Sequence, residues 1–245
     1  MLFKSHQIVT WYKILAFNHF ILATSKPWHK PQAATALPGE VGFLWAHNPE
    51  ELNQLAVKEK NIRYIFFLHW NWMVPEALWK NYECVCFHMT DVPYGRGGSP
   101  LQNLIVRGHK DTKLTALRMV KEMDAGPVYT KRELSMEGNA AEIYQRAGEL
   151  SFDIIRWMID NQPEPLDQRG ESVVFKRRKP EQSVLPGSGD ITALYDHIRM
   201  LDAPTYPMAF IEHGEFIIEF AGAEVQGDEL NASVRIRKKP NQRKL

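Results

Sequence analysis

This sequence of 245 residues has only two cysteines, Cys84 and Cys86, which excludes a disulfide framework. The one candidate targeting segment, Ile8 to Ala23, is an apolar run interrupted by polar residues such as Lys13, so it predicts neither a spanning helix nor a clean signal peptide. We find no internal repeat and no low-complexity tract. Neither sign of charge dominates, since 30 basic residues face 29 acidic ones. These absences favour a cytoplasmic globular protein.

A glycine-rich phosphate-binding fingerprint is also missing. Two apolar runs near the N-terminus, Phe20–Ala23 and Val41–Trp45, are predicted strands, and no such fingerprint follows either of them. A dinucleotide cofactor is therefore disfavoured. A helix is predicted over residues 49–56, with Asn48 as its N-cap and a proline in its first turn. Residues 1–20 support no structural prediction of their own.

The centre of the sequence predicts a strand, a short helix and a second strand. The strands are expected at Tyr64–Leu68 and Cys84–Phe87, with the helix at Pro75–Lys80 between them. Residues 91–100 contain three glycines and two prolines, which predicts a loop that holds neither a helix nor a strand ladder. Ligands bind at the carboxyl ends of strands in an open α/β sheet, so we expect chemistry at His88.

Nine residues share a fixed spacing across this region: His88, Pro93, Arg96, Gly97, Pro100, Thr115, Met119, Asp124 and Gly126. The set resembles the signature of the N10-formyltetrahydrofolate-dependent formyltransferases. The resemblance covers residues 64–129 well and extends more loosely to Pro207. The segment RMVKEMDAGPV is most similar to the branch that formylates nucleotide-linked amino sugars. The resemblance implies a Rossmann-like α/β fold, with a mostly parallel sheet flanked by helices and a small C-terminal α+β appendage.

The resemblance also implies an acyl transfer, in which a formyl group moves from N10-formyltetrahydrofolate to an amine. His88 would act as general base and acid, or as a cationic stabiliser of the oxyanion. Asp124 would orient the imidazole and favour its charged form. The chemistry requires no metal. By itself, His88 would be a satisfied core histidine and Asp124 a turn residue.

One residue departs from the family pattern. The family has an asparagine two residues before the histidine, whereas this chain has Cys86, and a thiol is a weak hydrogen-bond donor. Asn71, which follows the preceding predicted strand, is the nearest replacement, and His69 is a second candidate. A relative that binds folate or a sugar nucleotide without turnover is a further alternative.

The two cysteines and His88 invite a metal-site interpretation, because they alternate along one strand. Same-face residues of a strand are about 6.6 Å apart, so three of them cannot close around one tetrahedral zinc without strong bending. Cys84 and Cys86 are better interpreted as small core residues.

Further candidates follow from position and from the resemblance. Each also has a structural interpretation, as a residue that seals the core or shapes a loop. The candidates for folate binding are Leu68, Trp70, Met73, Arg96, Gly97 and Gly98. The candidates for acceptor binding, two basic residues for a diphosphate and one aromatic residue for a base, are Lys176, Arg178 and Tyr206.

A Pro-Gly-Ser-Gly segment at residues 186–189 predicts a domain boundary. Before it, residues 1–185 form the expected catalytic domain, abbreviated at its N-terminal part. After it come a small subdomain over 190–237 and a basic tail over 238–245 that we expect to be disordered. The remaining predicted elements are strands at 129–134, 173–175, 216–221 and 233–237, and helices at 140–161 and 190–200.

The distribution of charge bears on the acceptor. Residues 235–245 contain six basic residues and no acidic one, so residues 1–234 carry −5 of the chain's net +1. A net acidic body is a poor platform for tRNA. We therefore expect a nucleotide-diphosphate amino sugar, such as a 4-amino-4,6-dideoxysugar used for lipopolysaccharide O-antigen, with no nucleic-acid or membrane partner and with a homodimer formed through the β appendage. The alternative acceptor is another amine, such as methionyl-tRNA or a purine precursor.

Overall fold

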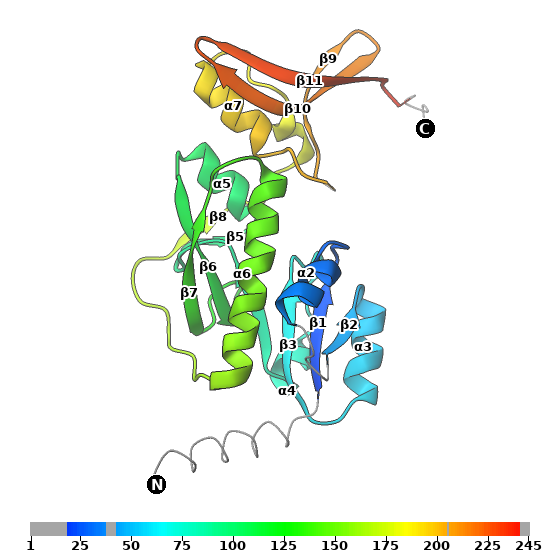
Figure 1. Cartoon of the computed structure of the whole chain (residues 1–245), viewed down its shortest axis with the longest axis vertical. Coiled ribbons are helices and arrows are strands. Elements are labelled where there is room, and N and C mark those ends of the chain that lie inside the picture. Colours follow the sequence, from blue (N-terminus) through cyan, green and yellow to red (C-terminus); the bar gives the residue numbers. More distant parts are fainter. Residues whose placement is uncertain (1–18, 38–42, 205, 241–245) are drawn as a thin grey trace. The chain divides into compact units, whose positions relative to one another are not determined.

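The computed structural model describes residues 19–37, 43–204 and 206–240 (Figure 1). The chain divides into two compact units. The first contains residues up to 96 together with 113–134 and 145–174. The second contains 97–112, 135–144 and the residues from 175 onward. A single boundary at residues 186–189, as predicted from the sequence, would leave only the residues after it in the second unit. The second unit instead also contains segments from earlier in the chain.

The first unit is organised by a six-stranded sheet of order β2-β1-β3-β4-β6-β7. β1 pairs in parallel with β2 and β3, and β3 pairs in parallel with β4, whereas β6 runs antiparallel to β4. The predicted Rossmann-like, mostly parallel sheet is thus confirmed. The strands are β1 (His19–Thr24), β2 (Phe43–Ala46), β3 (Ile62–Leu68), β4 (Cys84–His88), β6 (Asp111–Arg118) and β7 (Val128–Ser135).

Local sequence signals account for most helices around this sheet. The N-cap predicted at Asn48 is confirmed, because its Oδ1 accepts a hydrogen bond of 2.9 Å from the Glu51 amide. Pro75 is the N-cap of its helix rather than its first residue. The first helix of the described chain, α2, was not predicted, since it lacks an apolar periodicity. The helices are α2 (His29–Ala36), α3 (Pro49–Lys58), α4 (Glu76–Asn81) and α6 (Ala140–Asn161).

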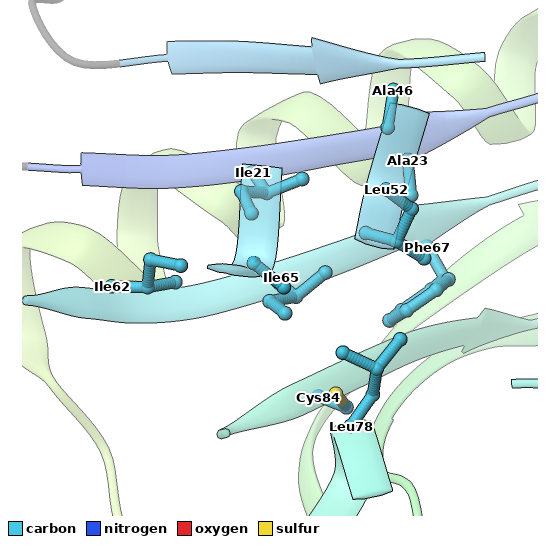
Figure 2. Close-up of a cluster of buried hydrophobic side chains, with 10 residues drawn as sticks. Ile21, Ala23, Ala46, Leu52, Ile62, Ile65, Phe67, Leu78 and Cys84 are labelled. Atoms are coloured by element: carbon cyan, nitrogen blue, oxygen red, sulfur yellow. The ribbon is translucent and has the colours of Figure 1, made fainter. Parts of the chain in front are cut away.

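The central strands are buried on both faces. Ile21, Ile65 and Phe67 pack with side chains from α3 and α4 on one face, among them Leu52 and Leu78 (Figure 2). The residues that alternate with the strand members of this cluster, such as those at 20, 22, 64 and 66, are buried as well. Burial on both faces explains why β3 is an almost continuous apolar run. The strand ends are thereby held in a fixed register.

The second unit has a helix and an antiparallel sheet of order β11-β10-β9. The Asp190 carboxylate caps the helix by accepting a 2.7 Å hydrogen bond from the Ala193 amide. This is the predicted small α+β appendage. Its elements, with a short helix from earlier in the chain and a 3-10 turn, are α5 (Pro100–Val106), η1 (Pro180–Ser183), α7 (Ile191–Arg199), β9 (Ala209–His213), β10 (Phe216–Gln226) and β11 (Glu229–Lys238).

Two sequence predictions were wrong in part. The loop over 91–100 contains a short strand, β5 (Tyr94–Gly97), which pairs with β8 (Val173–Phe175). Proline is tolerated there because Pro93 contributes only its carbonyl, which accepts from the Val173 amide at 3.1 Å.

The start of the basic tail is also ordered, contrary to the prediction for residues 238–245. Lys238 is the last residue of β11. The Lys239 ammonium lies 2.6 Å from the Glu212 carboxylate, and the Lys239 amide donates to the Glu215 carbonyl at 2.8 Å. Residues 241–245 lie outside the described residues, as do residues 1–18, which include the part of the interrupted apolar run before residue 19. Across the ranges that the structure describes, no helix is long and apolar enough to cross a membrane.

The connection between β6 and β7 passes close to the end of β6. The Arg118 amide donates to the Pro127 carbonyl at 2.9 Å, and a Cβ added at Gly126 would lie 1.8 Å from the Arg118 carbonyl oxygen. No L side chain fits without moving the backbone. Gly126 is therefore required for this close approach.

We expect Gly126→Ala to lower the free energy of unfolding by about 1–3 kcal/mol or more, because the new methyl group overlaps a main-chain carbonyl. Urea unfolding measures the change. Gly187→Ala is the matched control, since no atom lies within 4 Å of the Cβ position there. Equal stability of the two variants would contradict the close approach.

Candidate active site

His88 and Asp124 face each other at the carboxyl end of β4. The His88 side chain is only 9% exposed, and its Nδ1 lies 3.6 Å from the Asp124 carboxylate. Its other nitrogen, Nε2, lies 2.8 Å from the Gly95 carbonyl oxygen. A carbonyl can only accept, so Nε2 carries a hydrogen and Nδ1 is directed at the carboxylate. The two predicted catalytic residues are thus brought together, and the ring is held from both sides.

The chain after His88 is anchored by two buried threonines. Thr115, which lies opposite His88 in the β4–β6 pair, donates to the Thr90 carbonyl at 2.7 Å. Thr90 donates to the Gly95 carbonyl at 3.3 Å, the same oxygen that His88 contacts. The position of the imidazole therefore depends on the fixed path of the loop over 90–95.

Asp124 is held by Gln168, a residue that no sequence pattern pointed to. Gln168 donates to the main-chain carbonyls of Asp124 and Gly126, each at 2.8 Å. Its side-chain oxygen accepts from two guanidinium nitrogens of Arg96, at 3.0 and 2.7 Å. Arg96, predicted to bind folate, thus supports the Asp124 turn through Gln168. Asp124 has a φ of 54°, a left-handed conformation that aspartate tolerates better than most residues.

Cys86 occupies the position of the family's asparagine. Its side chain is partly buried and packs against the core cluster that includes Phe67 and Cys84. Burial and the nearby Asp124 carboxylate raise the pKa of the Cys86 thiol well above its usual range. The thiol is therefore neutral at physiological pH, and it remains a weak hydrogen-bond donor.

The residues after β3 present aromatic surface. Trp70 packs edge-to-face on Phe67, with ring centroids 5.8 Å apart, and on Trp72, at 4.9 Å. Trp72 is 44% exposed and Met73 is 77% exposed. Two large apolar side chains in water beside a strand end suit a planar ligand ring. Leu68 is buried in the core.

Asn71 is exposed and, within the part of the chain that the structure describes, makes no hydrogen bond. Its assignment as an oxyanion donor stays a prediction. His69, the other candidate named from the sequence, is held far more firmly.

A buried chain of polar groups connects β1 to the residue that follows β3. Thr24 Oγ1 lies 2.6 Å from His29 Nδ1, and His29 Nε2 lies 3.0 Å from His69 Nδ1. Thr24 and His29 are completely buried. Burial, then the neighbouring His69, lowers the pKa of His29 to about 3, and burial lowers the pKa of His69 to about 4. Both rings are therefore neutral at physiological pH. Sequence reasoning missed Thr24 and His29, although polar residues directly after a strand were a usable signal.

The predicted acceptor residues gather in the second unit around Ser99. The Ser99 hydroxyl lies 3.1 Å from the Arg178 amide and 3.4 Å from the Tyr206 hydroxyl. The Lys176 carbonyl accepts a hydrogen bond of 3.0 Å from the Asn103 side chain. A Cβ added at Gly98 would lie 2.5 Å from the Cβ of Arg177. Gly98 is thus required for close packing of the basic segment. Gly97, also predicted for folate, has a φ of 99°, which suits glycine.

The buried histidine pair predicts a dependence of stability on pH. Below pH 6.5 the unfolded chain protonates both rings, whereas the folded chain keeps them neutral until about pH 4, so the unfolded state binds more protons in this window. The contribution of the neutral histidine pair to the free energy of unfolding is complete above pH 6.5 and is lost as the pH falls. Each histidine contributes a slope of at most about 1.4 kcal/mol per pH unit.

Urea unfolding between pH 7.5 and 5 measures this slope. We expect a shallower slope in His29→Gln/His69→Gln than in the native protein, with His213→Gln, an exposed histidine, as the matched control. Identical slopes in the native protein and the double variant would contradict the neutral buried pair.

We expect Gln168→Leu to loosen the Asp124 turn, because it removes two hydrogen bonds from Arg96 and two to main-chain carbonyls. The loss is about 2 kcal/mol of stability, with faster hydrogen exchange over residues 122–127. Gln54→Leu, on the exposed surface of α3, is the control. Unchanged exchange in this turn would show that Gln168 does not hold it.

Comparisons with known proteins show which family the chain resembles. Residues 180–237 match the family model described as methionyl-tRNA formyltransferase, C-terminal domain. The solved structure of methionyl-tRNA formyltransferase from Clostridium thermocellum is 41% identical, with a TM-score of 0.86 over 90% of this chain and 99% of that one. Methionyl-tRNA formyltransferase of Bacillus thuringiensis (strain Al Hakam) is 30% identical over 136 residues, which is 53% of this chain and 43% of that protein. The match thus spans less than half of this curated relative.

The sugar-specific branch has weaker support. A solved sugar N-formyltransferase from Shewanella sp. is 16% identical, with a TM-score of 0.59 over 78% of this chain and 91% of that one, which shows a common fold alone. The family expected from the residues 88–126 is confirmed, whereas the branch stays a prediction. On the similarity to the Clostridium structure over nearly its whole length, the chain belongs to the formyltransferase family that includes methionyl-tRNA formyltransferase.

Proposed function

We propose that this protein transfers a formyl group from N10-formyltetrahydrofolate to the amino group of an acceptor. The observation that carries the proposal is the contact between His88 and Asp124 at the carboxyl end of β4. Ligands of open α/β sheets bind at this edge. The aromatic surface of Trp70 and Trp72, beside the same edge, supports a site for the pterin ring, with Met73 at its border.

The reaction makes one bond and breaks one. The acceptor nitrogen bonds to the formyl carbon, the bond from that carbon to N10 breaks, and a proton leaves the acceptor nitrogen while one is gained by N10. His88 is positioned to carry this proton, because the Asp124 carboxylate stabilises the imidazolium that forms in between. The Gly95 carbonyl and the carboxylate together keep the ring in one orientation.

For the acceptor, the family relatives favour methionyl-tRNA over the sugar nucleotide that the charge of the sequence favoured. That charge argument counted the basic residues of the C-terminus apart from the rest of the chain. Arg235 and Arg237, in the predicted strand, and Lys238, in the predicted tail, all lie exposed on β11, so they form a basic strand in the second unit. A basic strand in a domain that matches the C-terminal model supports contact with tRNA phosphates.

A nucleotide-linked 4-amino-4,6-dideoxysugar is the second candidate acceptor. It is favoured by the placement of Lys176, Arg178 and Tyr206 near Ser99 in the second unit. The exposed Lys176 offers a cation for a diphosphate and Tyr206 a ring for a base, whereas the Arg178 guanidinium donates to the Gln182 carbonyl. The two acceptors differ in their expected response to salt, since a tRNA contact over many phosphates weakens steeply as ionic strength rises.

We expect formylated product when the purified protein is incubated with N10-formyltetrahydrofolate and either methionyl-tRNA or a panel of nucleotide-linked 4-amino sugars, with the gain of one formyl group detected by mass spectrometry. His88→Asn and Asp124→Asn should each lower turnover by about 10²-fold or more, because proton transfer at the reacting nitrogen is lost. Near-native rates in both variants would remove the mechanism.

The acceptor panel separates the alternatives. Product with methionyl-tRNA alone, suppressed by salt, identifies a tRNA enzyme, whereas product with a sugar nucleotide alone identifies the other branch. Folate binding without product from any acceptor contradicts the transferase proposal and favours a binding protein.

A further inference from the structure

With His88 assigned to proton transfer, neither Asp124 nor Cys86 supplies a strong hydrogen-bond donor for the formyl oxygen. Acyl transfer builds negative charge on that oxygen, and enzymes place a hydrogen-bond donor against it. The resemblance places an asparagine at the position of Cys86, and the neutral thiol found there is a weak donor. Asp124 offers only acceptor oxygens when ionised. The inference below rests on the proposed function and concerns where the missing donor lies.

The sheet brings His69 to the same edge as His88. Phe67 of β3 is the partner of Cys86 in β4, so His69 and His88, each two residues further on, follow the ends of neighbouring parallel strands. On the other side, Leu68 is the partner of Thr24 at the end of β1. The chain leaves β1 toward β2 and returns to β3, so His69 stands at the point where the strand order reverses, the usual place of a ligand crevice.

The His69 ring is fixed rather than mobile. Its Nδ1 lies 3.0 Å from His29 Nε2, while the two ring centroids are 5.0 Å apart and the planes differ by 14°. The two ring planes are nearly parallel, and the two nitrogens are much closer to each other than the ring centroids are. The rings therefore meet edge to edge, with the hydrogen on one nitrogen directed at the lone pair of the other. The Ser25 hydroxyl donates to the His69 carbonyl at 2.7 Å, and His69 has a φ of 45°. Such a left-handed conformation is uncommon for residues other than glycine, although histidine adopts it more often than most, and conformations of this kind gather at functional sites.

The hydrogen-bond chain selects one tautomer of His69. Thr24 Oγ1 already accepts from the Lys26 amide at 3.1 Å, so its own hydrogen is available for His29 Nδ1, 2.6 Å away. His29 then carries its hydrogen on Nε2 and donates it to His69 Nδ1. The hydrogen of His69 consequently lies on Nε2. Because Thr24 and His29 are completely buried, water does not compete for these hydrogen bonds.

We propose that the Nε2–H group of His69 donates a hydrogen bond to the formyl oxygen. This is the role that the resemblance gives to an asparagine at the position where this chain has Cys86. A neutral imidazole resembles an amide here, since it donates without carrying a charge. His29 and Thr24 are positioning residues, which set the tautomer and orientation of His69. His88 keeps the separate task of proton transfer.

The test measures the formyl carbonyl directly. A donor to that oxygen lowers the C=O stretching frequency, which isotope-edited infrared spectroscopy resolves for 10-formyl-5,8-dideazafolate labelled with ¹³C at the formyl group. The spectrum is recorded without an acceptor amine, so that the formyl group stays on N10. We expect the frequency of the bound analogue to fall below that of the analogue in water-free solvent in the native protein, and to return toward it in His69→Leu. With N10-formyltetrahydrofolate, His69→Leu should lower kcat by about 10²–10³-fold with little change in KM for folate.

Two further variants distinguish a donor from a merely structural residue. His69→Gln retains an N–H donor and should retain part of the shift. Cys86→Asn, introduced into His69→Leu, restores the family's donor from another strand and should recover both the shift and kcat, which a loss of folding would not allow. Circular dichroism and thermal unfolding verify that each variant folds.

The proposal is overturned if the shift persists in His69→Leu, or if Asn71→Ala abolishes it while His69→Leu does not. These outcomes are separate from failure of the transferase activity. If the analogue binds and no acceptor is formylated, the proposed function fails while the spectrum still decides where the donor lies. If the analogue does not bind, the folate site fails and this inference fails with it.

Discussion

The parallel register of β1, β3 and β4 is the constraint on which the site depends. Pairing of Thr24 with Leu68 and of Phe67 with Cys86 brings the residues that follow each strand to one edge. Core packing on both faces fixes that register, because a slip of one residue would turn every apolar side chain to the opposite face. The chemistry-bearing side chains are therefore positioned by strand pairing rather than by mobile loops.

Two kinds of histidine result at this edge. His88 has a carboxylate 3.6 Å from one nitrogen and a carbonyl 2.8 Å from the other, which suits a ring that carries a proton. His29 contacts Thr24 and His69, and burial keeps both histidine rings neutral. We therefore assign proton transfer to His88 and neutral hydrogen bonding to His69.

Much of this arrangement was predictable from the sequence, because its determinants are local. Apolar runs gave β3 and β4, helical periodicity gave α6, and Asn48 marked the start of α3. The resemblance carried by residues 88–126 selected His88 and Asp124, whose side chains the structure brings together. What was missed depends on contacts distant in sequence: Gln168 contacts a turn 44 residues away, and the His29–His69 contact spans 40 residues. The strand β5 was missed because its partner β8 supplies the ladder.

The central claim is that the edge formed by β3 and β4 binds and activates the formyl group. A crystal structure of the protein with 10-formyl-5,8-dideazafolate tests it most directly. The account predicts the formyl oxygen within hydrogen-bond distance of His69 Nε2, with N10 beside His88 and the ring system against Trp70 and Trp72. A formyl group bound away from this edge, or directed at Asn71 with His69 turned aside, would contradict it.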